Sequence, residues 1–253
     1  MHTQQDSPWV KILGVDVANV TQQQAIRLVE SMIGRRDDRT RAVYYVNAHT
    51  LNLAAADEDY RHVLNRADCV FGDGTGVRWA ARLAGVKLLD NVNGTDMMPA
   101  LFRQLNDQGL SCFFLGADQA IVARAAENAQ RAFPGWRLAG YHHGFVTPES
   151  STALIERINA ARPDVLLVAM GNPLQERWID DHRDLLRVPV AMGVGGLFNF
   201  WSGNVRRAPR WLRRAGHEWL AVMFRQPHKA RRYLLGNPLF LARILRARFR
   251  RYS

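Results

Sequence analysis

Short apolar runs alternate with longer helical patterns along most of this chain, and this alternation restricts the folds available to it. Helical patterns occupy residues 51–64 and 119–133. Strands that are apolar on both faces are typical of a parallel sheet with helices packed on each side. The sequence therefore predicts an α/β protein whose mostly parallel sheet is covered by helices on both faces. The expected strands are residues 42–46, 69–71, 112–115, 136–141, 165–170 and 190–194.

The net charge of +11 is concentrated near the C-terminus. Residues 203–253 contain 14 of the 34 Lys and Arg residues and a single acid, Glu218, whereas residues 1–202 are close to neutral. We therefore expect a core over residues 1–202 and a basic, Arg-rich helical appendage over residues 203–253. Such asymmetry indicates a polyanionic partner, which is nucleic acid, an anionic lipid surface or a phosphorylated substrate.

The basic appendage also carries large apolar residues in a helical pattern. A basic amphipathic helix with Trp and Phe anchors is typical of a membrane interface, and no helix-turn-helix, RNP or zinc pattern favours nucleic acid. We expect the appendage to associate with an anionic membrane surface and expect no nucleic-acid partner. In a final helix after Pro238, the apolar stripe would hold Leu241, Leu245, Phe249 and Tyr252, with Arg243, Arg246 and Arg250 opposite.

The remaining composition points to a cytoplasmic chain. No uncharged run is long enough for a spanning helix, and the N-terminus has no apolar signal-peptide region. Cys69 and Cys112 each lie in an apolar run, which favours two buried free thiols in a reducing compartment over a disulfide.

Polar residues and glycines gather where the predicted strands end. Ligands of such sheets bind beyond the carboxyl ends of the strands, where backbone amides and helix starts attract anions. A nucleotide diphosphate fits this pattern, although each glycine cluster taken alone is as easily a tight strand–helix turn. The dinucleotide-binding fingerprint lacks its third glycine and no P-loop sequence occurs. The polar residues and glycines at the ends of the predicted strands are Asn47, His49, Thr50, Gly72, Asp73, Gly74, Gly76, Gly171, Asn172, Pro173, Gln175, Glu176, Gly193, Gly195 and Gly196.

Asp73 is the most informative single residue in these turns. A carboxylate between two glycines at a strand end could accept a proton from an attacking hydroxyl, or it could simply cap the helix that follows. Asp96 has the same two readings, a helix N-cap or a group that holds a sugar hydroxyl. His142 and His143 have no partner ligands at metal-binding spacing, so no metal site is expected.

Taken together, these motifs resemble the WecG/TagA/CpsF glycosyltransferases of bacterial surface-polysaccharide and teichoic-acid synthesis. The resemblance covers residues 12–233, and its ordered motifs are far more specific together than any one alone. The motifs are Asn47-Ala-His49, Gly72-Asp73-Gly74-Thr-Gly76-Val77, Asn93-Gly94-Thr95-Asp96, Phe114-Leu115-Gly116-Ala117, Gly171-Asn172-Pro173-x-Gln175-Glu176-x-Trp178, Gly193-Val194-Gly195-Gly196-x-Phe198, Arg-Arg-Ala-Pro and Glu218-Trp219-Leu220.

The resemblance implies a Rossmann-like catalytic core and an inverting, metal-independent transfer of a sugar. The donor would be a UDP-sugar, used as co-substrate with no further cofactor, and the acceptor a saccharide on polyprenyl diphosphate. Asp73 would be the catalytic base and the new linkage would be β. The enzyme would be peripheral on the inner face of the plasma membrane, with self-association away from it.

The resemblance also implies roles for the remaining site residues. Donor binding is expected from Asn47, His49, Gly74, Asn93, Gly94, Asp96, Gly171, Asn172, Gln175, Glu176, Gly195 and Gly196. Contacts to the acceptor and the leaving diphosphate are expected from Arg207, Arg210, Arg214, Lys229 and Arg232.

Four positions depart from the family pattern. Asn91, Val222 and Lys229 replace expected arginines, and Gln226 replaces an expected glutamate. Because lost guanidinium or carboxylate groups change recognition, a neutral hexose donor is as plausible as an N-acetylmannosamine-type donor. Two other classes stay open: a non-catalytic basic protein that binds membrane or nucleic acid, and another nucleotide-dependent Rossmann-like enzyme such as an oxidoreductase.

Overall fold

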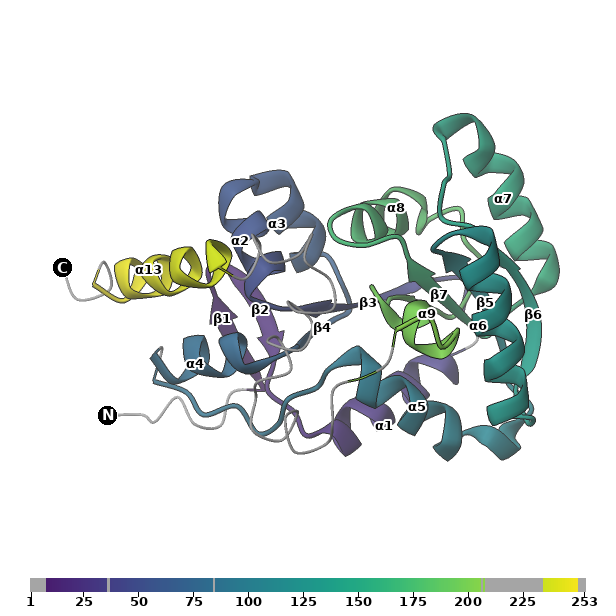
Figure 1. Cartoon of the computed structure of the whole chain (residues 1–253), viewed down its shortest axis with the longest axis horizontal. Coiled ribbons are helices and arrows are strands. Elements are labelled where there is room, and N and C mark those ends of the chain that lie inside the picture. The colour runs from purple at the N-terminus through teal and green to yellow at the C-terminus, as the bar shows by residue number, and fades with distance from the viewer. Residues whose placement is uncertain (1–7, 36, 84, 206, 208–233, 250–253) are drawn as a thin grey trace.

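A computed structural model describes residues 8–35, 37–83, 85–205, 207 and 234–249. Its strands form one eight-stranded sheet in the order β1-β2-β4-β3-β8-β7-β5-β6, in which β1 and β2 pair antiparallel and every other pairing is parallel (Figure 1). The predicted, mostly parallel α/β sheet is confirmed. The strands are β1 (Trp9–Ile12), β2 (Val15–Ala18), β3 (Arg41–Val46), β4 (Cys69–Gly72), β5 (Ser111–Gly116), β6 (Arg137–His142), β7 (Val165–Ala169) and β8 (Val190–Gly193).

Helices cover both faces of this sheet, as the apolar strands predict. In β7, Val165 and Leu167 pack into one buried cluster while Leu166 and Val168 pack into the other, because successive side chains of a strand point to opposite faces. One face is covered by α1 (Gln22–Ile33), α5 (Gly94–Gln104), α6 (Gln119–Ala132) and α9 (Leu197–Trp201). The other is covered by α2 (Ala48–Ala56), α3 (Glu58–Asn65), α4 (Thr75–Leu83), α7 (Pro148–Ala161), α8 (Leu174–His182) and α13 (Gly236–Phe249). A short 3₁₀ helix, η2 (Asn106–Gln108), follows α5.

The N-terminal hairpin of β1 and β2 was not among the predicted strands. β1 alternates exposed and buried side chains over only four residues, and β2 has three buried residues and one half-buried residue, so each offers a weak periodic signal. Leu13 and Gly14 form the turn with φ of 48° and 84°. Positive φ at both central positions is what a tight hairpin turn requires, and a leucine at the first of them conceals that turn from sequence analysis.

The predicted single helix over residues 51–64 is wrong, since two helices, α2 and α3, occupy this region. Asp57 separates them because its side chain accepts a hydrogen bond from the Tyr60 backbone N–H, at 2.9 Å, and so caps α3. A side chain that caps a new helix competes with continuation of the previous one.

The C-terminal helix α13 packs against α2 and α4 (Figure 1). Phe240 and Ile244 are buried in the core cluster of that face. Arg243 donates to the backbone and side-chain oxygens of Asn52 at 2.7 and 3.0 Å, and the Asn52 amide donates to the Gly236 carbonyl at 2.7 Å. The helix was predicted, whereas its packing against α2 and α4 was not.

The expected faces of α13 are therefore corrected in part. Arg243 was expected on the solvent side and instead binds the protein, while Leu241 is half-buried and Leu245 and Arg246 are exposed. The side chains of Phe249, Arg250 and Tyr252 lie outside the described residues, and the boundary between residues 202 and 203 stays a prediction. Among the helices that the structure describes, none is both long and apolar enough to cross a bilayer.

Phe240→Ala should lower the free energy of unfolding by about 3 kcal/mol, because a fully buried aromatic ring is removed from the contact between α13 and the core. Urea unfolding followed by circular dichroism measures this. The matched control is Leu239→Ala, whose side chain is 48% exposed and should change stability by no more than about 0.5 kcal/mol. Equal effects of the two substitutions would show that α13 is not docked as described.

Candidate active site

The carboxyl ends of four neighbouring strands lie within two residues of one level of the sheet. Val46 of β3 pairs with Gly72 of β4, and Gly193 of β8 pairs with Val168 of β7. Neighbouring strands lie about 4.8 Å apart, so the turns after β4, β3, β8 and β7 span about 14 Å. The structure therefore brings together the polar turns that the sequence analysis singled out along this edge.

The turn after β4 holds Asp73 half-buried. The Asp73 backbone N–H donates to the Val46 carbonyl at 2.8 Å, and the Gly74 N–H donates to Asn91 Oδ1 at 2.6 Å. Gly74 has φ of 94°, a conformation in which a residue with a side chain would be strained. Both backbone groups flanking the carboxylate are thus fixed, and α4 begins directly after them.

The turn after β3 starts α2. Asn47 Oδ1 accepts from the backbone N–H groups of His49 and Thr50 at 3.0 and 3.2 Å, so its side-chain carbonyl caps the helix. Asn47 and His49 are half-buried at this edge. A Cβ on Gly76, in the first turn of α4, would lie 3.1 Å from Ala48 Cβ, so the first turns of α2 and α4 touch.

The start of α5 holds a third polar group. Asn93 Oδ1 caps the helix by accepting from the Asp96 N–H at 2.8 Å, and its amide donates to Asp96 Oδ2 at 2.9 Å. Arg207 forms an ion pair with Asp96, with 2.5 Å between Nη1 and Oδ1. Gly94 lies against the ring of Tyr45. The N-cap of α5 is therefore Asn93, and the helix-cap interpretation of Asp96 is wrong, because Asp96 lies in the first turn of the helix. The pairing of Asp96 with Arg207 was not foreseen.

The turns after β7 and β8 are connected through Gln175. Its Oε1 accepts from the Gly195 N–H at 3.0 Å, and its Nε2 donates to Glu176 Oε1 at 2.7 Å. Gly171 and Gly195 have φ of 82° and 55°, and the peptide bond between Asn172 and Pro173 is cis. These positive φ angles favour glycine at both turns.

Glu176 lies beneath these turns with none of its surface exposed. Its oxygens accept hydrogen bonds from Asn172, Gln175 and Tyr60. Burial raises the pKa of Glu176 to about 7, although its hydrogen-bond donors act in the opposite direction. In this structure the buried carboxylate of Glu176 accepts these hydrogen bonds from neighbouring side chains that the structure describes. Its contact with the donor stays a prediction. Sequence reasoning missed Tyr60, because a tyrosine inside a helix carries no motif.

Several predicted residues cannot be placed at the site. Arg210, Arg214, Lys229 and Arg232 lie outside the described residues, as do Val222 and Gln226. Gly196 is exposed in the turn after β8. His142 and His143 lie at the end of the edge strand β6, with 4.2 Å between ring centroids. Among the described residues, no three His, Cys, Asp or Glu side chains are grouped as metal ligands.

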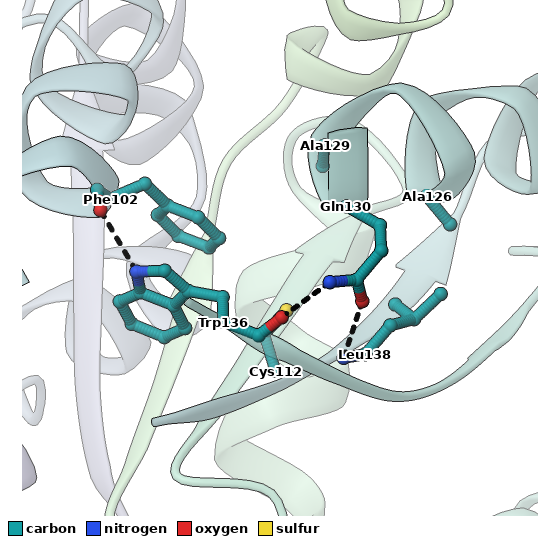
Figure 2. A pocket seen from close by; sticks show the side chains of 7 residues that line it. All are labelled: Phe102, Cys112, Ala126, Ala129, Gln130, Trp136 and Leu138. Carbon is teal, nitrogen blue, oxygen red and sulfur yellow. Dashed lines mark hydrogen bonds between the residues drawn. The ribbon is translucent and has the colours of Figure 1, made fainter. Parts of the chain in front are cut away.

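A small apolar cavity lies elsewhere, between α6 and the first residues of β5 and β6 (Figure 2). Gln130 closes it by donating to the Trp136 carbonyl and accepting from the Leu138 N–H, at 2.8 and 3.0 Å. Cys112 lines it and is a buried free thiol whose pKa burial raises to about 12. The cavity belongs to the core at the opposite end of the strands from Asp73. Cys69 is likewise free and buried, as predicted.

Comparison with known proteins gives the class of this chain. Residues 10–253 match the sequence description of the glycosyl transferase WecG/TagA/CpsF family, and the chain belongs to this family of glycosyltransferases. It is similar to an N-acetylglucosaminyldiphosphoundecaprenol N-acetyl-beta-D-mannosaminyltransferase of Bacillus spizizenii, with 35% identity over 74% of this chain and 72% of the relative. A protein of the same description from Staphylococcus aureus is 29% identical over 94% of this chain and 93% of the relative.

The pKa of Glu176 predicts a change of stability with pH. The folded protein keeps the carboxyl protonated up to pH about 7, whereas the unfolded chain releases the proton near its ordinary pKa of 4.5. The stability contributed by Glu176 is therefore present below that ordinary pKa and is lost as pH rises through 7. Glu176→Gln carries no titratable proton. Its stability relative to the wild type should increase by up to about 3 kcal/mol between pH ~4.5 and pH ~8.

Urea unfolding of both proteins at the two pH values measures this difference. Glu156→Gln, at an exposed position of α7, is the control and should follow the wild type at both pH values. If the curves of Glu176→Gln and the wild type stay parallel, Glu176 does not titrate between them.

Proposed function

We propose that this enzyme transfers a hexose or N-acetylhexosamine from a UDP-sugar to a saccharide carried on polyprenyl diphosphate. Asp73 takes the proton of the acceptor hydroxyl as its oxygen bonds to the anomeric carbon. The bond from that carbon to the diphosphate breaks, and UDP leaves with the electron pair. Attack from the face opposite the diphosphate inverts the anomeric centre, so an α-linked donor gives a β-linked product.

The observation that carries this proposal is the fixed position of Asp73. Its carboxylate is half-buried at the carboxyl edge of a parallel sheet, on a turn whose two backbone N–H groups are bonded to Val46 and Asn91. A general base must be held within hydrogen-bond reach of the hydroxyl that it deprotonates. The turn supplies such rigidity, and it lies beside the capped start of α2.

Three helices support binding of the diphosphate. The first turns of α2, α4 and α8 all lie at this edge, directly after β3, β4 and β7. Helix N-termini carry partial positive charge and unpaired N–H groups, which suit anionic oxygens. We propose that these helix starts and arginines from the C-terminal part of the chain stabilise the leaving UDP without a metal ion. Arg207 would contribute once it exchanges Asp96 for a phosphate oxygen.

The acceptor is proposed from the relatives. Both named relatives act, by their description, on N-acetylglucosaminyldiphosphoundecaprenol. For the donor we propose only the class of UDP-hexoses and UDP-N-acetylhexosamines, because Asn91 stands where an arginine was expected. The Asn91 side-chain oxygen accepts a hydrogen bond from the Gly74 N–H beside Asp73. Mass spectrometry of products formed from a panel of UDP-sugars, with a short-chain diphospholipid saccharide as acceptor, identifies the donor.

A membrane surface is proposed as the second partner. Trp79 and Arg82 of α4 are exposed, as are Leu235, Leu239 and Arg246 at α13, and α13 packs beside α4. Leu239 and Arg246 are seven residues apart in the sequence, so they share one face of α13. Apolar side chains with neighbouring cations suit the interface of an anionic bilayer. Attachment there brings the active-site edge to its lipid-linked acceptor.

Asp73→Asn should lower kcat by a factor of about 100 or more, because the amide cannot accept the hydroxyl proton. Binding of UDP, measured by calorimetry, should stay within about twofold of the wild type. The control is Asp118→Asn, at the N-cap of α6, where asparagine caps as well as aspartate. Undiminished turnover in Asp73→Asn would remove Asp73 from the role of base.

Arg246→Glu should weaken binding to anionic phosphatidylglycerol vesicles roughly thirtyfold, since it replaces a cation that contributes about 1 kcal/mol by an anion that is repelled to a similar extent. Sedimentation of the full chain with vesicles measures the bound fraction. Arg124→Glu, at an exposed position of α6 on the other face of the sheet, is the control and should bind as the wild type does. Equal losses in both variants would argue for a nonspecific effect of net charge.

A further inference from the structure

Glu176 is the centre of a buried hydrogen-bond cluster. Its Oε1 accepts from Asn172 Nδ2 at 2.5 Å and from Gln175 Nε2 at 2.7 Å. Its Oε2 accepts from the Tyr60 hydroxyl at 3.1 Å, and its backbone carbonyl accepts from the Tyr44 hydroxyl at the same distance. The side chain of Glu176 thus joins α3, the turn before α8 and α8 itself, and its backbone carbonyl adds β3.

The partners of Oε1 belong to the turns at the active-site edge. Because the Gln175 Nε2 group is held by Glu176, the Gln175 Oε1 group is directed at the Gly195 N–H. A Cβ on Gly193 would lie 3.0 Å from Gln175 Nε2, so the turn after β8 closes tightly on this amide. Asn172 is fixed in the same way in the turn after β7. The orientation of both amides depends on a single acceptor atom.

We propose that Glu176 is a positioning residue, which aligns the turns at residues 171–173 and 193–196 for the UDP part of the donor. This inference rests on the proposed function, because it assumes that UDP binds at these turns. Glu176 does not touch the nucleotide. It acts through Gln175 and Asn172, whose amides set the spacing of the two turns.

The requirement is for an acceptor at the Oε1 position. The ionised carboxylate of Glu176 provides this acceptor. The protonated acid provides it too, when its proton lies on Oε2 and points to the Tyr60 oxygen. Glutamine provides it as well, with its amide nitrogen facing the tyrosine oxygen, which can accept. Methionine has a similar volume but no such acceptor. The buried amide of Gln175 and the half-buried amide of Asn172 would then lose their acceptor, and both would turn to find another.

Two substitutions at this position test the proposal, with the wild type assayed beside them. In Glu176→Met, we expect the Kd for UDP and the KM for the donor to rise about tenfold or more, with kcat at saturating donor changed by less than about threefold. In Glu176→Gln, both constants should stay within about twofold of the wild type. Hydrogen exchange at the Gly195 amide should be faster in the methionine variant alone. Tyr60→Phe is the control that removes the Oε2 partner only, and it should bind UDP as the wild type does.

The outcomes separate this inference from the proposed function. Failure of the wild type to bind UDP overturns both. Unchanged UDP binding in folded Glu176→Met, with thermal stability alone reduced, shows that Glu176 supports only the fold and overturns the inference while the proposed function stands. If Glu176→Met is not recovered folded, Glu176→Asp takes its place, because its carboxylate is one methylene too short to reach both amides. Normal UDP binding in that variant likewise overturns the inference.

Discussion

The parallel alignment of β4, β3, β8 and β7 is the constraint on which the rest of the structure depends. It brings the ends of four strands to within two residues of one level, so that turns far apart in the sequence lie side by side. Three of the turns are then fixed by side-chain amide oxygens that accept from backbone N–H groups. Asn47 accepts from the start of α2, Asn91 from Gly74 and Gln175 from Gly195. The sheet thus brings the turns together, and hydrogen bonds to single amide side chains fix their conformations.

Much of this arrangement could be predicted from sequence because it follows from hydrophobic periodicity. The six predicted strands exist, and their apolar character on both faces explains the two helical layers. The polar turns could be found because a parallel sheet places its ligands at one edge. The antiparallel hairpin, the break at Asp57 and the docking of α13 could not be found in this way. The hairpin and the break depend on single turn or cap residues, and the docking of α13 depends on contacts with residues far away in the sequence, such as Asn52. Neither kind of contact is visible in hydrophobic periodicity.

The residues of the candidate site likewise divide into those that could be predicted from sequence and those that could not. Asp73, Asn47 and Gln175 were found because they belong to motifs at strand ends, whereas the role of Tyr60 became visible only through its hydrogen bond to Glu176. Glu176 itself was found by motif, but its motif gave no sign of its depth. The burial and the direction of the Glu176 side chain result from the packing of α3 against α8. This packing cannot be predicted from the residues next to Glu176 in the sequence.

The docking of α13 has a consequence for the order in which the fold can be completed. Phe240 fills a space bounded by α2 and α4, helices that the ribosome makes long before it reaches α13. During synthesis, this part of the core must remain uncovered until the late helix emerges. Apolar surface of α2 and α4 therefore stays uncovered on the nascent chain until α13 has been synthesised, and this layer of the core closes only then.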